Sequence, residues 1–160
     1  MKMIHFGKWK GYSLALGIAA VAVAQPFRPM IVSGVSMTPT YASGELHLFD
    51  RSAKEFRLGD VVVVRSDEGT IVKRIAYGPG DTLYQSRVHG QVTDLIIVKI
   101  GKRPNKNIHK KILGENEFYL LGDNLDDSRD SRIFGTVGRD QILGRLIDWR
   151  PAPDRSLPAN

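Results

Sequence analysis

Ser36 and Lys73 are the residues of this chain whose types combine most directly into catalytic chemistry. Ser36 begins the turn Ser-Met-Thr-Pro-Thr, and Lys73 lies in a predicted strand over residues 70–77 that otherwise carries several aliphatic side chains. Burial among apolar neighbours penalises an ammonium, so such a lysine loses its proton easily and can serve as a general base. A serine hydroxyl becomes an effective nucleophile when a base removes its proton. The pair therefore predicts acyl transfer, most directly proteolysis.

The predicted strand places Lys73 next to apolar side chains. Side chains alternate between the two faces of a strand, so Lys73 shares a face with Ile71 and Ile75. Arg74 lies on the opposite face and stays charged. Each residue also has a plain structural interpretation: Lys73 as a surface lysine on a solvated face, and Ser36 as an ordinary residue of a proline-containing turn.

A dense polar run, residues 122–132, supplies the third element. It contains four Asp, two Arg, two Ser and one Asn. Such a run can form a hydrogen-bonded scaffold that holds neighbouring side chains in place. The alternatives are a solvated acidic turn and a calcium loop. The spacing of a calcium loop is not met, and no glutamate closes it, so we expect no metal.

Composition limits the classes of protein. At 160 residues, with 42% hydrophobic and 25% charged residues, the chain suits one folded unit. Cysteine is absent, which excludes a disulfide framework, a thiolate zinc site and a cysteine nucleophile. The net charge of +6 could serve nucleic-acid binding, but three N-terminal lysines precede an apolar run. That arrangement favours contact with a lipid bilayer, and we expect no nucleic-acid partner.

The apolar run over residues 11–24 carries no charged residue. With its flanks it predicts a single transmembrane helix, so residues 1–27 are expected to form a cytoplasmic stub and membrane anchor. The rival interpretation is a cleaved secretory signal, because Ala22-Val23-Ala24 has the small-x-small form of a cleavage site. Either interpretation delivers Ser36 and the rest of the chain to the far side of a membrane.

The body of the chain, residues 28–150, alternates short β-type runs with turn residues, and the proline-rich tail over 151–160 is expected to be loose. A turn over 67–69 predicts a hairpin between two of the runs. The expected strands are residues 45–49, 60–65, 70–77, 94–100, 117–121 and 141–149.

Taken in order, these segments resemble the type I signal peptidase family, the membrane-anchored Ser-Lys proteases that remove signal peptides. Residues 34–40, Gly-Val-Ser-Met-Thr-Pro-Thr, are similar to the nucleophile box of the family. Residues 59–62 with 72–75 and 78–81 are similar to its strand pair, which contains the Lys-Arg dipeptide. Residues 122–135 are similar to its last signature. The resemblance implies a mainly β fold, a compact β-barrel-like core of antiparallel sheets after one N-terminal transmembrane helix.

The resemblance also implies roles for particular residues. Ser36 would be the nucleophile and Lys73 the general base, with Ser128 orienting the lysine. Asp130 and Arg132 would form a structural ion pair. The Ser36 N–H would supply part of an oxyanion hole, and Gly34 stands where some members place a second serine hydroxyl. No cofactor is implied.

The expected function is a membrane-bound endopeptidase that removes N-terminal signal peptides from exported preproteins with small residues before the cut. The expected place is the plasma membrane of a bacterium, with the catalytic domain on the outer face; the mitochondrial inner membrane is the alternative. Two other functions stay open, a dedicated maturation peptidase of the same Ser-Lys type and a non-catalytic membrane-tethered β domain. The basic run over residues 99–111 would be a lipid contact or a solvated loop.

Overall fold

The computed structural model describes residues 25–67, 69–88, 91–94 and 108–147. These residues form strands joined by turns, together with one short α-helix and one 3-10 helix. The elements are β1 (Phe27–Ile31), β2 (Leu46–Asp50), β3 (Val61–Ser66), β4 (Gly69–Tyr77), β5 (Thr82–Val88), β6 (Gln91–Asp94), β7 (Ile108–Ile112), β8 (Glu117–Leu121), α2 (Ser131–Phe134), β9 (Val137–Gly138), η1 (Arg139–Gln141) and β10 (Ile142–Leu146).

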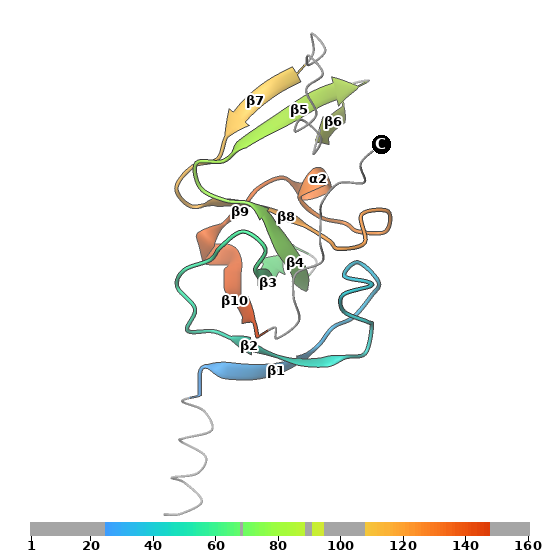
Figure 1. Cartoon of the computed structure of the whole chain (residues 1–160), viewed down its shortest axis with the longest axis vertical. Coiled ribbons are helices and arrows are strands. Elements are labelled where there is room, and N and C mark those ends of the chain that lie inside the picture. Colours follow the sequence, from blue (N-terminus) through green and yellow to red (C-terminus); the bar gives the residue numbers. More distant parts are fainter. Residues whose placement is uncertain (1–24, 68, 89–90, 95–107, 148–160) are drawn as a thin grey trace, which may run out of the picture.

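The strands form two antiparallel sheets. The larger is seven-stranded in the order β1-β2-β10-β3-β4-β8-β9, and the smaller is three-stranded in the order β6-β5-β7. The most C-terminal of the described strands, β10, lies between β2 and β3, which come much earlier in the sequence. Figure 1 shows the small sheet at the end of the molecule opposite β1 and β2.

The mainly β, antiparallel prediction is confirmed, but the barrel-like closure is not found. Within the described residues, β1 and β9 end the seven-stranded sheet and do not pair with each other. One physical reason is the length of β9, which comprises two residues and pairs only with the first two of β8. The sheet therefore stays open.

The core is built on both faces of β3. Its four consecutive valines are all buried, and alternation sends successive side chains to opposite sides. Val61 and Val63 join one hydrophobic cluster, with Met37, Tyr41 and others from the segment after β1. Val62 and Val64 join a second cluster with residues of β4, β8 and β10. A strand buried on both faces needs a continuous apolar run, which explains the run of valines.

Strands β3 and β4 form the expected hairpin, with Ser66 opposite Gly69 and Val62 opposite Lys73. Beyond it, β4 pairs with β8 only through Arg74, Ile75 and Tyr77, with a bulge in that pairing. Within the described chain, no strand pairs with residues 69–73 on the β8 side of β4. Half of this strand therefore presents an open edge.

Five of the expected strands match observed ones within a few residues: β2, β3, β4, β8 and β10. The expected strand over 94–100 and the basic run over 99–111 lie mostly outside the described residues. Strand β1 was not predicted, since it contains Pro29, a residue that a sheet accepts at its edge; β1 occupies that position. Strands β5, β6, β7 and β9 were also missed.

The expected anchor lies in residues that the structure does not describe, apart from its last residues. Among the described residues, no helix has the length and hydropathy needed to cross a bilayer.

Candidate active site

The turn that carries Ser36 follows β1 and is held from below by buried side chains. Met37 and Tyr41 are 1% and 0% exposed, and both belong to the cluster that covers Val61 and Val63 of β3. The Tyr41 N–H donates to the Met37 carbonyl at 2.9 Å, which closes the turn. Two residues of the turn are therefore fixed in the core, and Ser36, next to Met37, lies at its half-buried rim.

Ser36 and Lys73 are in direct contact. Lys73 Nζ donates a hydrogen bond to Ser36 Oγ over 2.7 Å, which lies within the range expected of a nucleophile and its base. Strand β4 brings the lysine to this position, and the residue is 4% exposed. Burial lowers the pKa of Lys73 below its ordinary value, although the negative charges of Asp130 and Asp123 oppose that effect. A lysine with a lowered pKa supplies the neutral amine that a general base requires.

Asp130 is fully buried and satisfies several donors at once. Its carboxylate accepts hydrogen bonds from the Gly122 N–H at 2.9 Å and from Arg132 Nε at 2.8 Å. It also caps α2 by accepting from the Arg132 N–H at 3.2 Å. Burial alone would raise the pKa of Asp130, but these hydrogen bonds together hold it below its ordinary value. Asp130 and Arg132 form an ion pair, and the structural role that the family resemblance implies for it remains a prediction.

Ser128 and the carbonyl of Ser36 both lie next to Gly122. A Cβ added to Gly122 would overlap Ser128 Oγ and would lie 2.5 Å from the Ser36 carbonyl oxygen. Only glycine therefore allows the polar run to approach the nucleophile turn this closely. The Ser128 hydroxyl is buried, and its interaction with the Asp130 carboxylate helps to lower the pKa of that group. Its expected role in orienting Lys73 remains a prediction.

Arg74, the neighbour of Lys73, is also buried. Its guanidinium forms a two-pronged ion pair with Asp123, with Nη2–Oδ2 at 2.6 Å and Nε–Oδ1 at 2.9 Å. The side chains are 4% and 2% exposed. A third hydrogen bond, 2.7 Å long, goes to the Gly59 carbonyl. This pair fixes the start of the polar run to β4.

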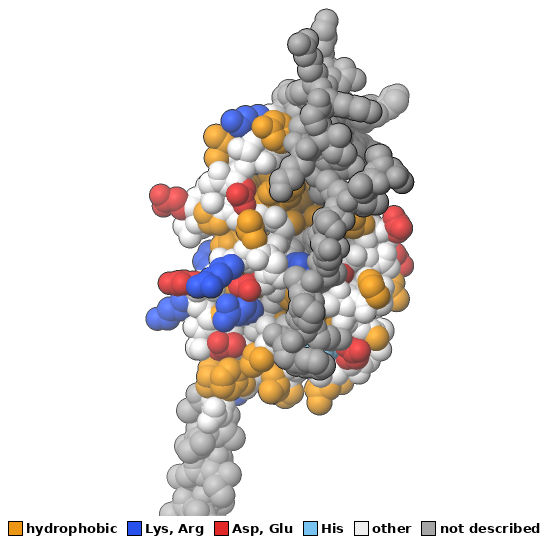
Figure 2. All heavy atoms as spheres, viewed as in Figure 1, with side chains coloured by type: hydrophobic (Ala, Val, Ile, Leu, Met, Phe, Trp, Pro, Cys, Tyr) orange, Lys and Arg blue, Asp and Glu red, His pale blue; other side chains and the backbone are white. Residues whose placement is uncertain are grey.

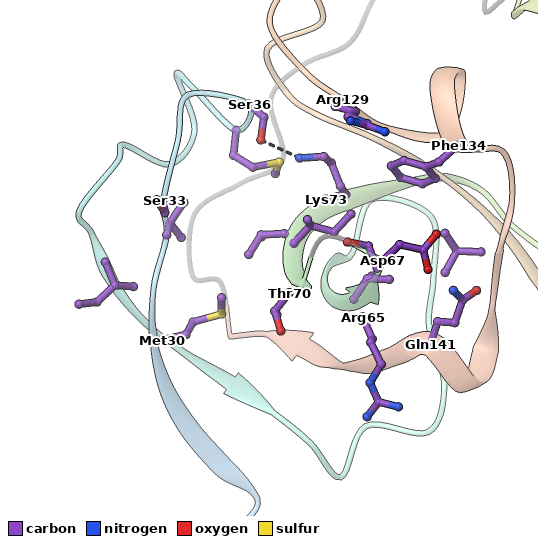
Figure 3. A pocket seen from close by; sticks show the side chains of 18 of the residues that line it. Met30, Ser33, Ser36, Arg65, Asp67, Thr70, Lys73, Arg129, Phe134 and Gln141 are labelled. Carbon is purple, nitrogen blue, oxygen red and sulfur yellow. Dashed lines mark hydrogen bonds between the residues drawn. The ribbon is translucent and has the colours of Figure 1, made fainter.

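A cleft of about 380 Å³ opens beside the Ser36–Lys73 pair. Its lining includes the end of β1 with the residues after it, 30–33, and the open edge of β4, residues 70–73. Figure 3 shows Ser36 and Lys73 joined by their hydrogen bond, with Arg129 and Phe134 nearby and Arg65 and Gln141 at a distance. A cleft that is lined by an open strand edge suits an extended peptide.

The position of Gly34 bears on the oxyanion hole. Gly34 has φ of 86°, a left-handed conformation that a serine adopts only with strain. Its N–H donates to Ser43 Oγ at 3.2 Å. Within the described residues, the Ser36 N–H is not used in any hydrogen bond of the turn, so it is available for a developing oxyanion.

Sequence reasoning missed the contribution of three residues. Arg74 and Asp123 were not paired, although an arginine in the middle of an apolar strand needs a carboxylate. Asn124 was assigned no role, yet its N–H donates to the Ser36 carbonyl at 3.0 Å.

Metal binding is a separate question. The described residues hold no group of three His, Cys, Asp or Glu side chains that could bind an ion.

Comparison with known proteins gives the family. Signal peptidase I of Bacillus licheniformis is 28% identical over 153 residues, which cover 84% of this chain and 82% of that protein. Signal peptidase IB of Staphylococcus aureus is 27% identical over 163 residues, 84% of each. A crystal structure of a signal peptidase I from Enterococcus faecalis V583 aligns with TM-score 0.40 and 22% identity, over 60% of this chain and 100% of that one. Residues 7–149 match the family of signal peptidases, peptidase S26, and the chain belongs to that family of serine endopeptidases.

Proposed function

We propose that this chain removes N-terminal signal peptides from exported preproteins, with Ser36 as the nucleophile and Lys73 as the general base. The single observation that carries the assignment of residues is the 2.7 Å contact between Lys73 Nζ and Ser36 Oγ in a buried position. Membership of the peptidase S26 family supports the reaction. A non-catalytic β domain would have no need for a buried lysine with a lowered pKa beside a hydroxyl.

In the first half of the reaction, Ser36 Oγ attacks the scissile carbonyl carbon while its proton passes to the neutral Lys73 amine. The Ser36 N–H donates to the oxygen that becomes negative. When the C–N bond breaks, the Lys73 ammonium returns the proton to the leaving amine. The signal peptide is then an ester on Ser36, and the mature protein is free to leave.

In the second half, water attacks the ester carbonyl and gives a proton to Lys73. Collapse of the intermediate breaks the bond to Ser36 Oγ, which takes the proton back. The lysine ends neutral, ready for another cycle. Because burial lowers the pKa of Lys73, its amine gives up and takes back a proton more readily than the amine of an exposed lysine does.

The substrate would bind as an extended strand in the cleft. Residues 70–73 of β4 have no partner strand on the cleft side within the described chain, and an added strand would pair with them. Side chains of a strand alternate in direction, so every second residue before the cut would face the apolar walls near Met30, Val32 and Ile71. This geometry supports a preference for small residues one and three positions before the scissile bond.

We place residues 1–27 as the membrane anchor and the described domain on the outer face of a bacterial plasma membrane. Support comes from the end of the molecule where β1 begins. Figure 2 shows hydrophobic side chains gathered at this end. Among the exposed apolar residues are Phe27, Ile31, Leu46, Leu48 and Ile147, which are 45%, 64%, 69%, 48% and 44% exposed. A surface of this kind suits contact with lipid.

The test is cleavage of secretory precursors by the full chain in detergent micelles. Ser36→Ala and Lys73→Ala should each abolish cleavage while the temperature of unfolding stays close to that of the unsubstituted chain. The matched control is Ser52→Ala, at an exposed serine after β2 that does not line the cleft. Activity that survives in either of the first two variants would exclude the pair. A panel of precursors tests the breadth of the function, since a dedicated peptidase would cleave a single one.

A further inference from the structure

The two peptide groups that flank Ser36 are both held by one residue, Asn124. Its backbone N–H donates to the Ser36 carbonyl at 3.0 Å. Its side-chain amide, Nδ2, donates to the Val35 carbonyl at 3.3 Å and to Thr38 Oγ1 at 3.2 Å. One residue of the polar run therefore contacts the carbonyl on each side of the nucleophile.

Of these two carbonyls, that of Val35 is the one that shares a peptide group with the Ser36 N–H. It accepts three hydrogen bonds, from Thr38 Oγ1 at 2.8 Å, from the Thr38 N–H at 3.1 Å and from Asn124 Nδ2 at 3.3 Å. The Val35 carbonyl and the Ser36 N–H belong to the same planar trans peptide, in which the two groups point in opposite directions. Fixing the carbonyl oxygen therefore fixes where the Ser36 N–H points.

Asn124 is itself well placed to act as a fixed support. Its Oδ1 accepts a hydrogen bond from the Asp127 N–H at 3.3 Å, which orients the side-chain amide with Nδ2 toward the turn. The preceding residue, Asp123, is bound to the buried Arg74 on β4. The position of Asn124 is thus tied to the same strand that carries Lys73.

We propose that Asn124 is a positioning residue that aims the Ser36 N–H at the oxyanion, acting with Thr38 through the shared Val35 carbonyl. This inference rests on the proposed function, because it concerns the transition state of the same cleavage. An oxyanion donor is effective only when it is aimed in advance at the place where charge develops. Asn124 and Thr38 supply that preorganisation without touching the substrate or the lysine.

The experiment compares Asn124→Ala and Thr38→Val in the full chain, with kcat and KM measured on one secretory precursor. Each variant removes a side-chain donor to the Val35 carbonyl. We expect kcat to fall about 10-fold to 10²-fold in each, with KM nearly unchanged. A misdirected Ser36 N–H destabilises the transition state more than it weakens substrate binding. Thr38→Ser, which keeps the hydroxyl, should restore most of the kcat lost in Thr38→Val.

The pH profile separates this role from a general structural one. Neither Asn124 nor Thr38 contacts Lys73, so the acidic limb of kcat/KM should stay where it is in the unsubstituted chain. Because both side chains act on one carbonyl, the loss in the double variant should differ from the product of the two single losses. Asp126→Asn, an exposed change in the same loop, is the matched control and should leave kcat and KM unchanged.

Four results would overturn the inference. The first is an unchanged kcat in Asn124→Ala and Thr38→Val, and the second is a rise in KM that accounts for the whole loss. The third is a displaced acidic limb, and the fourth is a Thr38→Ser variant as slow as Thr38→Val. In all of these the unsubstituted chain still cleaves, so the proposed function survives. A full chain that cleaves no precursor would instead overturn both.

Discussion

Lys73 and Arg74 are neighbours on β4, both are cations and both are buried, but the two faces of the strand treat them differently. Arg74 meets the Asp123 carboxylate through two hydrogen bonds and a carbonyl through a third. Lys73 meets a neutral hydroxyl at 2.7 Å, and the described residues provide it with no carboxylate at ion-pair distance. Burial is common to both, so the partner decides the outcome: an ion pair makes a structural clamp, and a hydroxyl makes a base.

The contrast explains how Lys73 and Arg74 can both be buried side by side on β4. A guanidinium stays charged and needs a countercharge when it is buried. An ammonium can escape the cost of burial by losing its proton. The clamp holds the polar run against β4, and the same run reaches the nucleophile turn through Asn124 and Gly122. The structural face of the strand therefore positions the groups that the catalytic face uses.

The largest expected effect comes from giving position 73 of β4 the same side chain as position 74. Lys73→Arg keeps a positive charge and a hydrogen-bond donor but cannot deprotonate, so cleavage should fall by about 10³-fold or more. The matched change on the other face, Arg74→Lys, should leave most of the activity and lower the unfolding temperature instead. Precursor cleavage and thermal unfolding of both variants check the contrast. Substantial activity in Lys73→Arg would contradict the role of the lysine as a base.

The next effect concerns the clamp. Asp123→Asn leaves the Arg74 guanidinium buried without its countercharge, so the free energy of unfolding should fall by about 3–5 kcal/mol. A second variant that replaces both partners by apolar residues, Arg74→Met with Asp123→Leu, should lose less than the single variant does. Denaturant unfolding measures both. Equal losses of unfolding free energy in the two variants would mean that the packing of the two side chains, and not their charges, stabilises the fold.

A smaller effect is expected at the contact between the polar run and the turn. Gly122→Ala would bring a methyl group to 2.5 Å from the Ser36 carbonyl oxygen and onto Ser128, so one segment must move away. We expect kcat to fall about tenfold, because the nucleophile turn shifts, with a loss of stability of about 1–3 kcal/mol. Gly69→Ala, at a glycine of the exposed hairpin turn, is the comparison for strain alone, since nothing surrounds its Cβ. A Gly122→Ala enzyme with full kcat would show that the close approach is not required.

The smallest effect is a displacement along the pH axis. The Asp130 carboxylate raises the pKa of Lys73 against the stronger effect of burial. Asp130→Asn removes this charge and the countercharge of Arg132, so the chain should become less stable, the pKa of Lys73 should fall further and the neutral amine should persist to lower pH. The acidic limb of kcat/KM should then move to lower pH, which a pH profile of cleavage measures. A movement to higher pH would contradict the assigned direction.

The strands that carry the site could be predicted because their patterns are local. Four valines in a row, a tight polar turn and an apolar run with one lysine mark β3 and β4 without reference to the rest of the chain. Ser36 and Lys73 were identified from type, position and family resemblance together. The open sheet was not foreseen, because closure depends on whether β1 and β9 meet, and no pattern within either strand encodes that.

The supporting contacts were harder to predict because they join distant segments. The hydrogen bond from Asn124 to Val35 spans 89 positions, and the ion pair of Arg74 and Asp123 spans 49. Each partner looks ordinary in its own segment: an asparagine in a polar loop, an arginine after a lysine. Only the unfavourable energy of an unpaired buried guanidinium hinted at a partner, and it did not say which aspartate.

The place of β10 in the sheet has a consequence for biosynthesis. Within the described residues, strand β2, beyond the nucleophile turn, joins the lysine-bearing hairpin in the large sheet only through β10, the most C-terminal of the described strands. We expect a nascent chain to stay without activity until β10 has been synthesised, because only then are β2 and the lysine-bearing hairpin joined in one sheet. A chain that ends at Asp140 should therefore be inert toward precursors, and cleavage by that truncated chain would refute this expectation.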